Sequence, residues 1–71
     1  MKKTINKFPE RLKQRRKELG MCQAELSRRI FVTQSVVCGY ESGKALPSIP
    51  TLIIIADALD VSIDWLLGRE E

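Results

Sequence analysis

The chain has 71 residues, of which 44% are hydrophobic and 30% charged, with a net charge of +3 and no histidine. This length allows one small domain, and the composition excludes an intrinsically disordered chain. The longest apolar run, Leu52–Ala56, is too short to cross a membrane, and no secretory stretch follows the basic first residues, so a cytoplasmic protein without a membrane segment is expected.

The two cysteines and the charge distribution narrow the function further. Cys22 and Cys38 form no CxxC pair and have no histidine to join them, so we expect free thiols, no metal site and no cofactor. Residues 1–47 carry eleven Lys and Arg against four Glu, whereas residues 48–71 carry one Arg against five acids. This asymmetry suggests that the first part of the chain binds a polyanion.

The first predicted helix spans residues 8–19, after a flexible basic segment at 1–7. Pro9 suits its first turn and Gly20 its end. Phe8, Leu12 and Leu19 recur at helical spacing and are expected to face the core.

Four further helices are predicted by their caps and apolar spacing. The second runs from residue 23 to about 30. The third spans 34–42, is capped by Thr33, and turns Val36, Val37 and Tyr40 inward. Ser48 caps a fourth helix that ends near residue 59, and Ser62 caps a short last helix that ends at Gly68. The expected fold is therefore all-α, a compact five-helix domain over residues 8–68 with a tail at 69–71.

The junction of the second and third helices is the feature most informative about function. A short helix, a tight turn, a capping Thr33 and a second short helix describe a helix-turn-helix over residues 23–42, in which the second helix enters the major groove of DNA. Gln34 and Ser35 lie at the exposed start of that helix. Glutamine can pair with adenine through two hydrogen bonds, and serine can donate or accept.

Short motifs in a defined order extend this interpretation along the chain. They are Arg11-Leu12-Lys13, Gln23-Ala24-Glu25-Leu26, Tyr40-Glu41-Ser42-Gly43-Lys44, Ala56-Asp57-Ala58-Leu59 and Trp65-Leu66-Leu67. In this order and spacing, residues 11–67 resemble the Xre family, the phage Cro and repressor type of helix-turn-helix DNA-binding domain.

The resemblance implies a role for particular side chains. Gln34, Ser35 and the residue at position 39 would face base edges, and Gln23 would donate to a phosphate while buttressing Gln34. A second phosphate would be held by Ser42, the Gly43 N–H and Lys44, with Arg11 as a weaker candidate. Thr33 and Cys38 are expected on the same DNA-facing surface, and Arg16 and Glu41 would form a buried ion pair.

Two positions depart from the family pattern. Phe31 replaces the usual glycine of the turn, where a left-handed residue is preferred. We expect a local distortion with the ring covering nearby apolar surface, the alternative being an exposed aromatic anchor for a protein partner. Gly39 replaces a long base-reading residue, which leaves direct reading to residues 33–36.

Ile54 and Leu67 fall where polar residues are expected, and this indicates a dimer interface on the last two helices.

The sequence therefore predicts a sequence-specific binder of double-stranded DNA, acting as a homodimeric repressor on a palindromic operator of a phage, mobile element or bacterium. The alternatives are an antitoxin that also binds its own operator and a restriction–modification controller. A protein partner would be a toxin or an antirepressor. An enzyme is not expected, because the chain has no histidine, metal-ligand cluster or phosphate-binding glycine loop.

Overall fold

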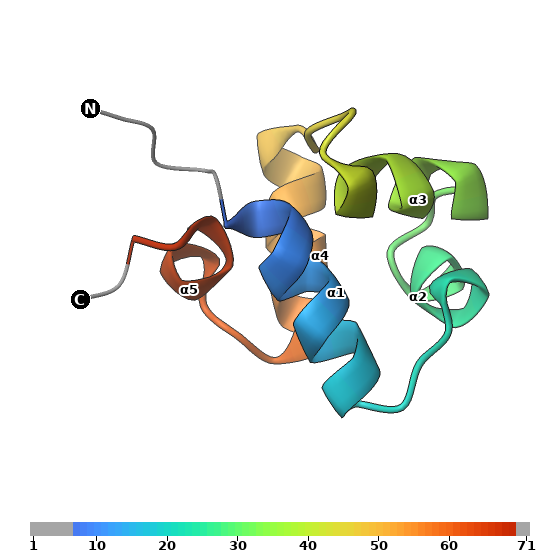
Figure 1. Cartoon of the computed structure of the whole chain (residues 1–71), viewed down its shortest axis with the longest axis horizontal. Helices are drawn as coiled ribbons and strands as arrows, with labels where there is room; N and C mark the ends of the chain where they lie inside the picture. Colours follow the sequence, from blue (N-terminus) through green and yellow to red (C-terminus); the bar gives the residue numbers. More distant parts are fainter. Residues whose placement is uncertain (1–6, 70–71) are drawn as a thin grey trace.

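The computed structural model describes residues 7–69 and contains five α-helices and no strand within that range. Their bounds are α1 (Phe8–Glu18), α2 (Gln23–Arg29), α3 (Gln34–Ser42), α4 (Ile49–Leu59) and α5 (Ile63–Leu67). α1 lies at the centre, with α2 and α3 on one side and α5 on the other, while α4 lies behind it (Figure 1). The all-α five-helix prediction is confirmed. Apart from Lys7 and Arg69, the expected segments 1–7 and 69–71 lie outside the described residues.

The helix limits follow the caps seen in the sequence. The hydroxyls of Thr33, Ser48 and Ser62 accept hydrogen bonds from the backbone N–H three residues later, which satisfies an N–H that has no partner within the helix. At the other end of α3, Gly43 adopts φ +83°, a left-handed conformation that glycine tolerates best. Cys22 begins α2 without a side-chain cap. These helix ends are therefore set by local residues.

The core gathers side chains from every helix around α1. Phe8 of α1 packs edge-on against Tyr40 of α3, with ring centroids 6.1 Å apart and an angle of 68° between the rings. The fully buried residues are Phe8, Leu12, Leu26, Ile30, Val37, Ile55, Leu59 and Leu66. No helix in the described range is long and apolar enough to span a membrane.

Two residues expected in the core lie at its edge instead. Leu19 is 41% exposed, because α1 ends one residue earlier and Leu19 is its C-cap; the neighbouring Met21 is buried in the core. Val36 is 36% exposed, because the buried stripe of α3 runs through Val37 and Tyr40. The prediction that Val36 faces inward is wrong, and this places an apolar side chain on the exposed part of α3.

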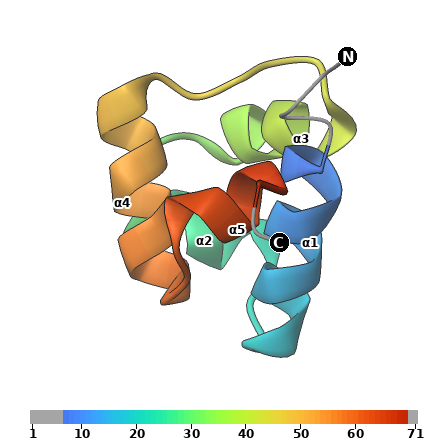
Figure 2. The same ribbon diagram turned by 90° about the vertical axis from the view of Figure 1, so that its left-hand side faces the viewer.

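Two arginines of α1 bind the carboxyl ends of neighbouring helices. Arg15 Nε donates to the Leu59 carbonyl at 2.9 Å, at the end of α4. Arg11 Nη1 donates to the Trp65 carbonyl at 2.6 Å, and its guanidinium lies 4.9 Å from the centroid of the Trp65 ring. Figure 2 shows α4 and α5 side by side and α1 next to α5. A cation at a helix carboxyl end interacts favourably with the helix dipole, so both arginines hold the helices together.

Candidate DNA-binding site

α2 and α3 form the helix-turn-helix expected from the sequence. The turn is closed by a hydrogen bond from the Val32 N–H to the Ser27 carbonyl at 3.0 Å. Thr33 has extended backbone and its hydroxyl accepts from the Val36 N–H at 3.3 Å, which fixes where α3 starts. The start of α3 is therefore held by local hydrogen bonds.

The first turns of α3 present short side chains to solvent. Gln34, Ser35, Val36 and Cys38 are all exposed, and so is the capping residue Thr33. This surface combines an amide that can donate and accept, two hydroxyls, a thiol and three methyl groups. Such a set can hydrogen-bond to base edges and contact a thymine methyl, which are the two kinds of direct readout in the major groove.

The end of α3 is closed by its own loop, and this changes the roles expected there. The Gly39 carbonyl accepts from the Lys44 N–H at 2.9 Å and from the Ser42 hydroxyl at 3.2 Å. The Gly43 N–H donates to the Tyr40 carbonyl at 3.3 Å. The backbone at Gly43 therefore closes the helix, contrary to the expectation of an N–H aimed at a phosphate. The Lys44 side chain is exposed, so this loop presents one positive charge to solvent.

Position 39 also differs from its expected place on the base-reading surface. A Cβ atom at Gly39 would lie 3.6 Å from the Cβ of Ala45, so this position borders the loop after α3. The residue is half-buried. Gly39 consequently adds no side chain to the exposed surface formed by residues 33–36 and Cys38.

An ion pair between α1 and α3 holds the helix-turn-helix in place. Arg16 Nε donates to Glu41 Oε2 at 2.7 Å and Arg16 Nη2 donates to Glu41 Oε1 at 3.1 Å, with side-chain exposures of only 9% and 4%. Arg16 Nη1 also donates to the Met21 carbonyl at 2.7 Å. The hydrogen bond to Glu41 raises the pKa of Arg16 above its ordinary value. The ion pair expected from the sequence is present.

Glu41 also accepts a hydrogen bond from α2. Burial acts to raise the pKa of Glu41, but hydrogen bonds from Arg16 and Gln23 outweigh it and lower that pKa. Gln23 Nε2 is the donor, 3.0 Å from Glu41 Oε1. The described contact of Gln23 is thus with Glu41, whereas the resemblance implied one with Gln34. Gln23 links the start of α2 to the end of α3.

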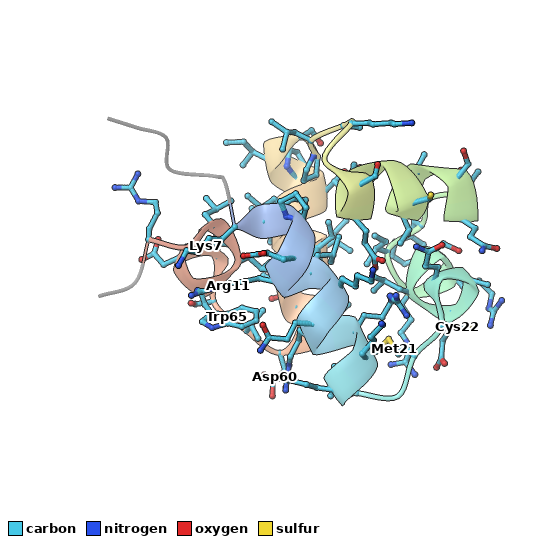
Figure 3. The ribbon with its side chains drawn as sticks, in the orientation of Figure 1. Lys7, Arg11, Met21, Cys22, Asp60 and Trp65 are labelled. Atoms are coloured by element: carbon cyan, nitrogen blue, oxygen red, sulfur yellow. The ribbon has the colours of Figure 1, made fainter. Side chains whose placement is uncertain are left out.

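Two basic residues of α1, Arg11 and Lys13, have different neighbours in the fold. Arg11 is bound to Trp65 on the α5 side of the molecule, where Figure 3 shows the two side chains together and far from α3, so it does not belong to the phosphate-binding set. Lys13 is exposed, and its charge helps to lower the pKa of Glu41, which places it near the end of α3. The sequence placed Lys13 in the same motif as Arg11, and only the fold distinguishes the surroundings of the two residues.

Phe31 keeps the backbone of the glycine that it replaces. Its φ is +65° and its side chain is 82% exposed. The expectation of a local distortion in which the ring covers nearby apolar surface is therefore wrong, because the turn keeps a left-handed conformation and the ring is exposed. A residue with a Cβ atom in this conformation costs about 1–2 kcal/mol.

Phe31→Gly is accordingly expected to stabilise the domain by about 1 kcal/mol, because relief of strain exceeds the added entropy of the unfolded chain. Urea unfolding followed by circular dichroism measures this change. Phe31→Ala, which keeps the Cβ atom, is the matched control and should give no gain. A Phe31→Gly variant less stable than the wild type would show that the exposed ring contributes packing.

The residues expected at a dimer interface are only partly exposed. Ile54 is half-buried against the core, and the exposed member of the three consecutive isoleucines is its neighbour Ile53, at 45%. Leu67 is half-buried and lines an apolar groove beside α4. The helical phase of α4 decides this difference, since Ile55 is the fully buried member of the three consecutive isoleucines.

Comparison with known proteins gives the family of the domain. The helix-turn-helix family model matches residues 12–66. The transcriptional repressor RstR of the cryptic phage CTXphi, from Vibrio cholerae, is 43% identical over 63 residues, which cover 89% of this chain and 56% of that protein. The chain thus spans about half the length of the curated relatives it matches.

Solved structures agree with this assignment. The P22 c2 repressor bound to a synthetic operator has a TM-score of 0.85 and 30% identity, covering 89% of this chain and 96% of that one. The restriction–modification controller C.AhdI from Aeromonas hydrophila has a TM-score of 0.80 and 31% identity, covering 87% and 94%. The chain belongs to the Xre-type helix-turn-helix family, and the curated relatives it matches are transcriptional regulators.

Proposed function

We propose that this protein binds a specific sequence of double-stranded DNA as a homodimer and represses transcription from a promoter of a phage, mobile element or bacterium. The observation that carries the proposal is the exposed start of α3, where groups suited to base edges project from a helix anchored by the Arg16–Glu41 pair. Similarity to a phage repressor over 89% of the chain supports it. Its work on DNA would then take place in the cytoplasm.

The proposed contacts divide into base-reading and phosphate-binding groups. Gln34 and Ser35 read base edges, with Val36 or Thr33 against a thymine methyl. Lys44 and Lys13 bind phosphates at the end of α3, and Ser42 lies beside them. An amide has two N–H donors, so Gln23 can hold Glu41 with one and a phosphate with the other. Phosphate contacts set register and affinity, whereas base contacts set specificity.

Selection of bound duplexes from a random pool, at two salt concentrations, tests the proposal. A shared palindromic motif among the selected duplexes is expected, with affinity that falls as salt rises because phosphate binding releases counterions. Binding to all sequences alike, with a steep salt dependence, would contradict sequence-specific repression.

Lys44→Ala should weaken binding to all duplexes alike. Loss of one phosphate contact is expected to reduce the slope of log K against log salt by about 1 and to leave the selected motif unchanged. Fluorescence anisotropy on one selected and one scrambled duplex measures both quantities. Lys17→Ala, on the exposed part of α1, is the matched control. A change of motif in Lys44→Ala would place this residue among the base-reading groups.

A restriction–modification controller is the second candidate. The observation that favours it is the similarity to C.AhdI over nearly the whole of that chain. An operator found upstream of a methyltransferase and endonuclease pair would support this candidate, and one within a prophage would support the repressor.

The exposed Phe31 keeps the antitoxin alternative open, because an isolated aromatic side chain at 82% exposure is suited to a pocket on a toxin or antirepressor. Co-purification with the product of a neighbouring reading frame, lost in Phe31→Ala, would favour this alternative. A wild-type protein that purifies alone would count against it.

A further inference from the structure

Gly39 is the one glycine of this chain whose backbone does not call for glycine. The other three, Gly20, Gly43 and Gly68, adopt φ of +75°, +83° and +75°, a region that glycine enters without steric cost. Gly39 lies in the interior of α3, and its φ is not positive. A left-handed conformation therefore does not explain the glycine at this position.

Crowding within the fold does not explain Gly39 either. Outside the backbone of α3, the described residues place one heavy atom within 4 Å of a Cβ atom added there, the Cβ of Ala45 at 3.6 Å, which is an ordinary van der Waals distance. At Gly68, by contrast, an added Cβ atom would lie 2.9 Å from the side chain of Lys7. The fold thus has room for alanine at position 39, and alanine is the better helix former. Glycine here makes the domain less stable than it could be.

The neighbours of Gly39 on the surface are short side chains. Ser35 is four residues before it and Ser42 three residues after it, so both lie on the same side of α3. Both serines are exposed, as is Ala45 in the loop that follows, and Gly39 itself is half-buried. None of these three side chains is longer than serine, so they do not hold another molecule away from the backbone of α3 at this point.

The polar groups of Gly39 are already used within the domain. Its carbonyl accepts from the Lys44 N–H at 2.9 Å, from the Ala45 N–H at 3.2 Å and from the Ser42 hydroxyl at 3.2 Å. Its N–H lies inside a helix, where the partner is the carbonyl four residues earlier. A contact at Gly39 is therefore steric: the absence of a Cβ atom lets another surface come closer to the helix.

We infer that the main chain of α3 at Gly39 lies directly against the sugar–phosphate backbone of the DNA, and that this glycine sets how deeply α3 enters the major groove. The inference rests on the proposed function. In the chain, Gly39 lies between the base-reading residues Gln34 and Ser35 and the phosphate-binding Lys44, so the duplex passes over it. A Cβ atom there holds the helix back and lengthens the hydrogen bonds to base edges. Such bonds need donor–acceptor distances of about 2.7–3.2 Å, so a displacement of about 1 Å removes them.

Gly39→Ala should change stability and DNA affinity in opposite directions, which a merely misfolded variant would not do. Its melting temperature should rise by about 4 °C, because alanine stabilises a helix interior relative to glycine. Its affinity for the selected duplex should fall at least about 10-fold, and its affinity for a scrambled duplex by much less. Circular dichroism and fluorescence anisotropy measure the two effects. Gln14→Ala, on the exposed part of α1, is the control and should bind DNA like the wild type.

Hydroxyl-radical footprinting of the selected duplex locates the contact on the DNA. The radicals cleave at each deoxyribose that solvent reaches, so a sugar covered by the main chain of α3 is protected. With the wild type at saturation, protected sugars are expected at the border of each half-site. Gly39→Ala, also at saturation, should expose those sugars and leave the rest of the footprint unchanged.

The possible results separate this inference from the proposed function. If Gly39→Ala binds the selected duplex within about twofold of the wild type, the DNA does not approach this glycine and the inference is overturned. A lower melting temperature for Gly39→Ala would also overturn it, because the fold itself would then require the glycine. If the wild type binds no duplex selectively, the proposed function fails and the inference fails with it.

Discussion

Glu41→Ala is expected to leave the domain largely unfolded at room temperature, at a cost of about 3–5 kcal/mol. Removing the carboxylate leaves the guanidinium of Arg16 buried at 9% exposure without its ionic partner, and it also removes the acceptor of Gln23. A single core in a chain of this length supplies about 3–5 kcal/mol in total. Loss of DNA binding by this variant would then follow from loss of the fold.

Urea unfolding and thermal melting measure the effect. Arg16→Met combined with Glu41→Leu is the informative control, because replacing both charges with apolar side chains removes the unpaired charge as well as the ion pair. The double variant should be considerably more stable than Glu41→Ala. An unchanged melting temperature for Glu41→Ala would show that this pair does not hold α1 to α3.

The Arg16–Glu41 pair makes the stability of the domain depend on pH. The pKa of Glu41 is lower in the folded state than its ordinary value of 4.5, so its contribution to stability is present above pH 4.5 and is lost as pH falls through the lowered pKa. Arg16, whose pKa is raised above its ordinary value by the hydrogen bond to Glu41, stays charged throughout that range. Unfolding free energy should therefore fall more steeply below pH 4.5 in the wild type than in the double variant.

The helices could be predicted from the sequence because their limits depend on nearby residues. Three helices begin at a hydroxyl side chain that accepts from a backbone N–H three residues later, at Thr33, Ser48 and Ser62. Gly43 ends α3 through hydrogen bonds from its own backbone N–H. Local chemistry thus determines where the elements of the candidate site begin and end.

Contacts between distant residues were the part that the sequence alone left open. Arg11 and Trp65 are 54 positions apart, and nothing in the local pattern distinguishes Arg11 from Lys13 as a phosphate-binding residue. The inward faces of α3 and α4 depend on helical phase, and an error of one residue exchanges Val36 for Val37 or Ile53 for Ile54. Only the assembled fold therefore shows which side chains lie in the core, which line the groove and which lie on the surface expected to face DNA.

Gln34→Ala is expected to remove discrimination at one base pair of the operator while the fold and the salt dependence stay unchanged. The exposed amide at the start of α3 can accept from adenine N6 and donate to adenine N7, and such a pair contributes about 1–3 kcal/mol, or roughly 10- to 100-fold, against the wrong base. Anisotropy titrations against the four base pairs at that position measure the change. Gln14→Ala, on the exposed part of α1, is the matched control.

Replacing the adenine with 7-deazaadenine separates this contact from indirect effects. The modified base lacks the N7 acceptor but pairs normally, so it should weaken the wild type and leave Gln34→Ala almost unaffected. Equal losses in both proteins would mean that Gln34 does not read this base. The reading would then fall to Ser35 and Val36, and a thymine-to-uracil substitution, which removes one methyl group, would be the next measurement to locate it.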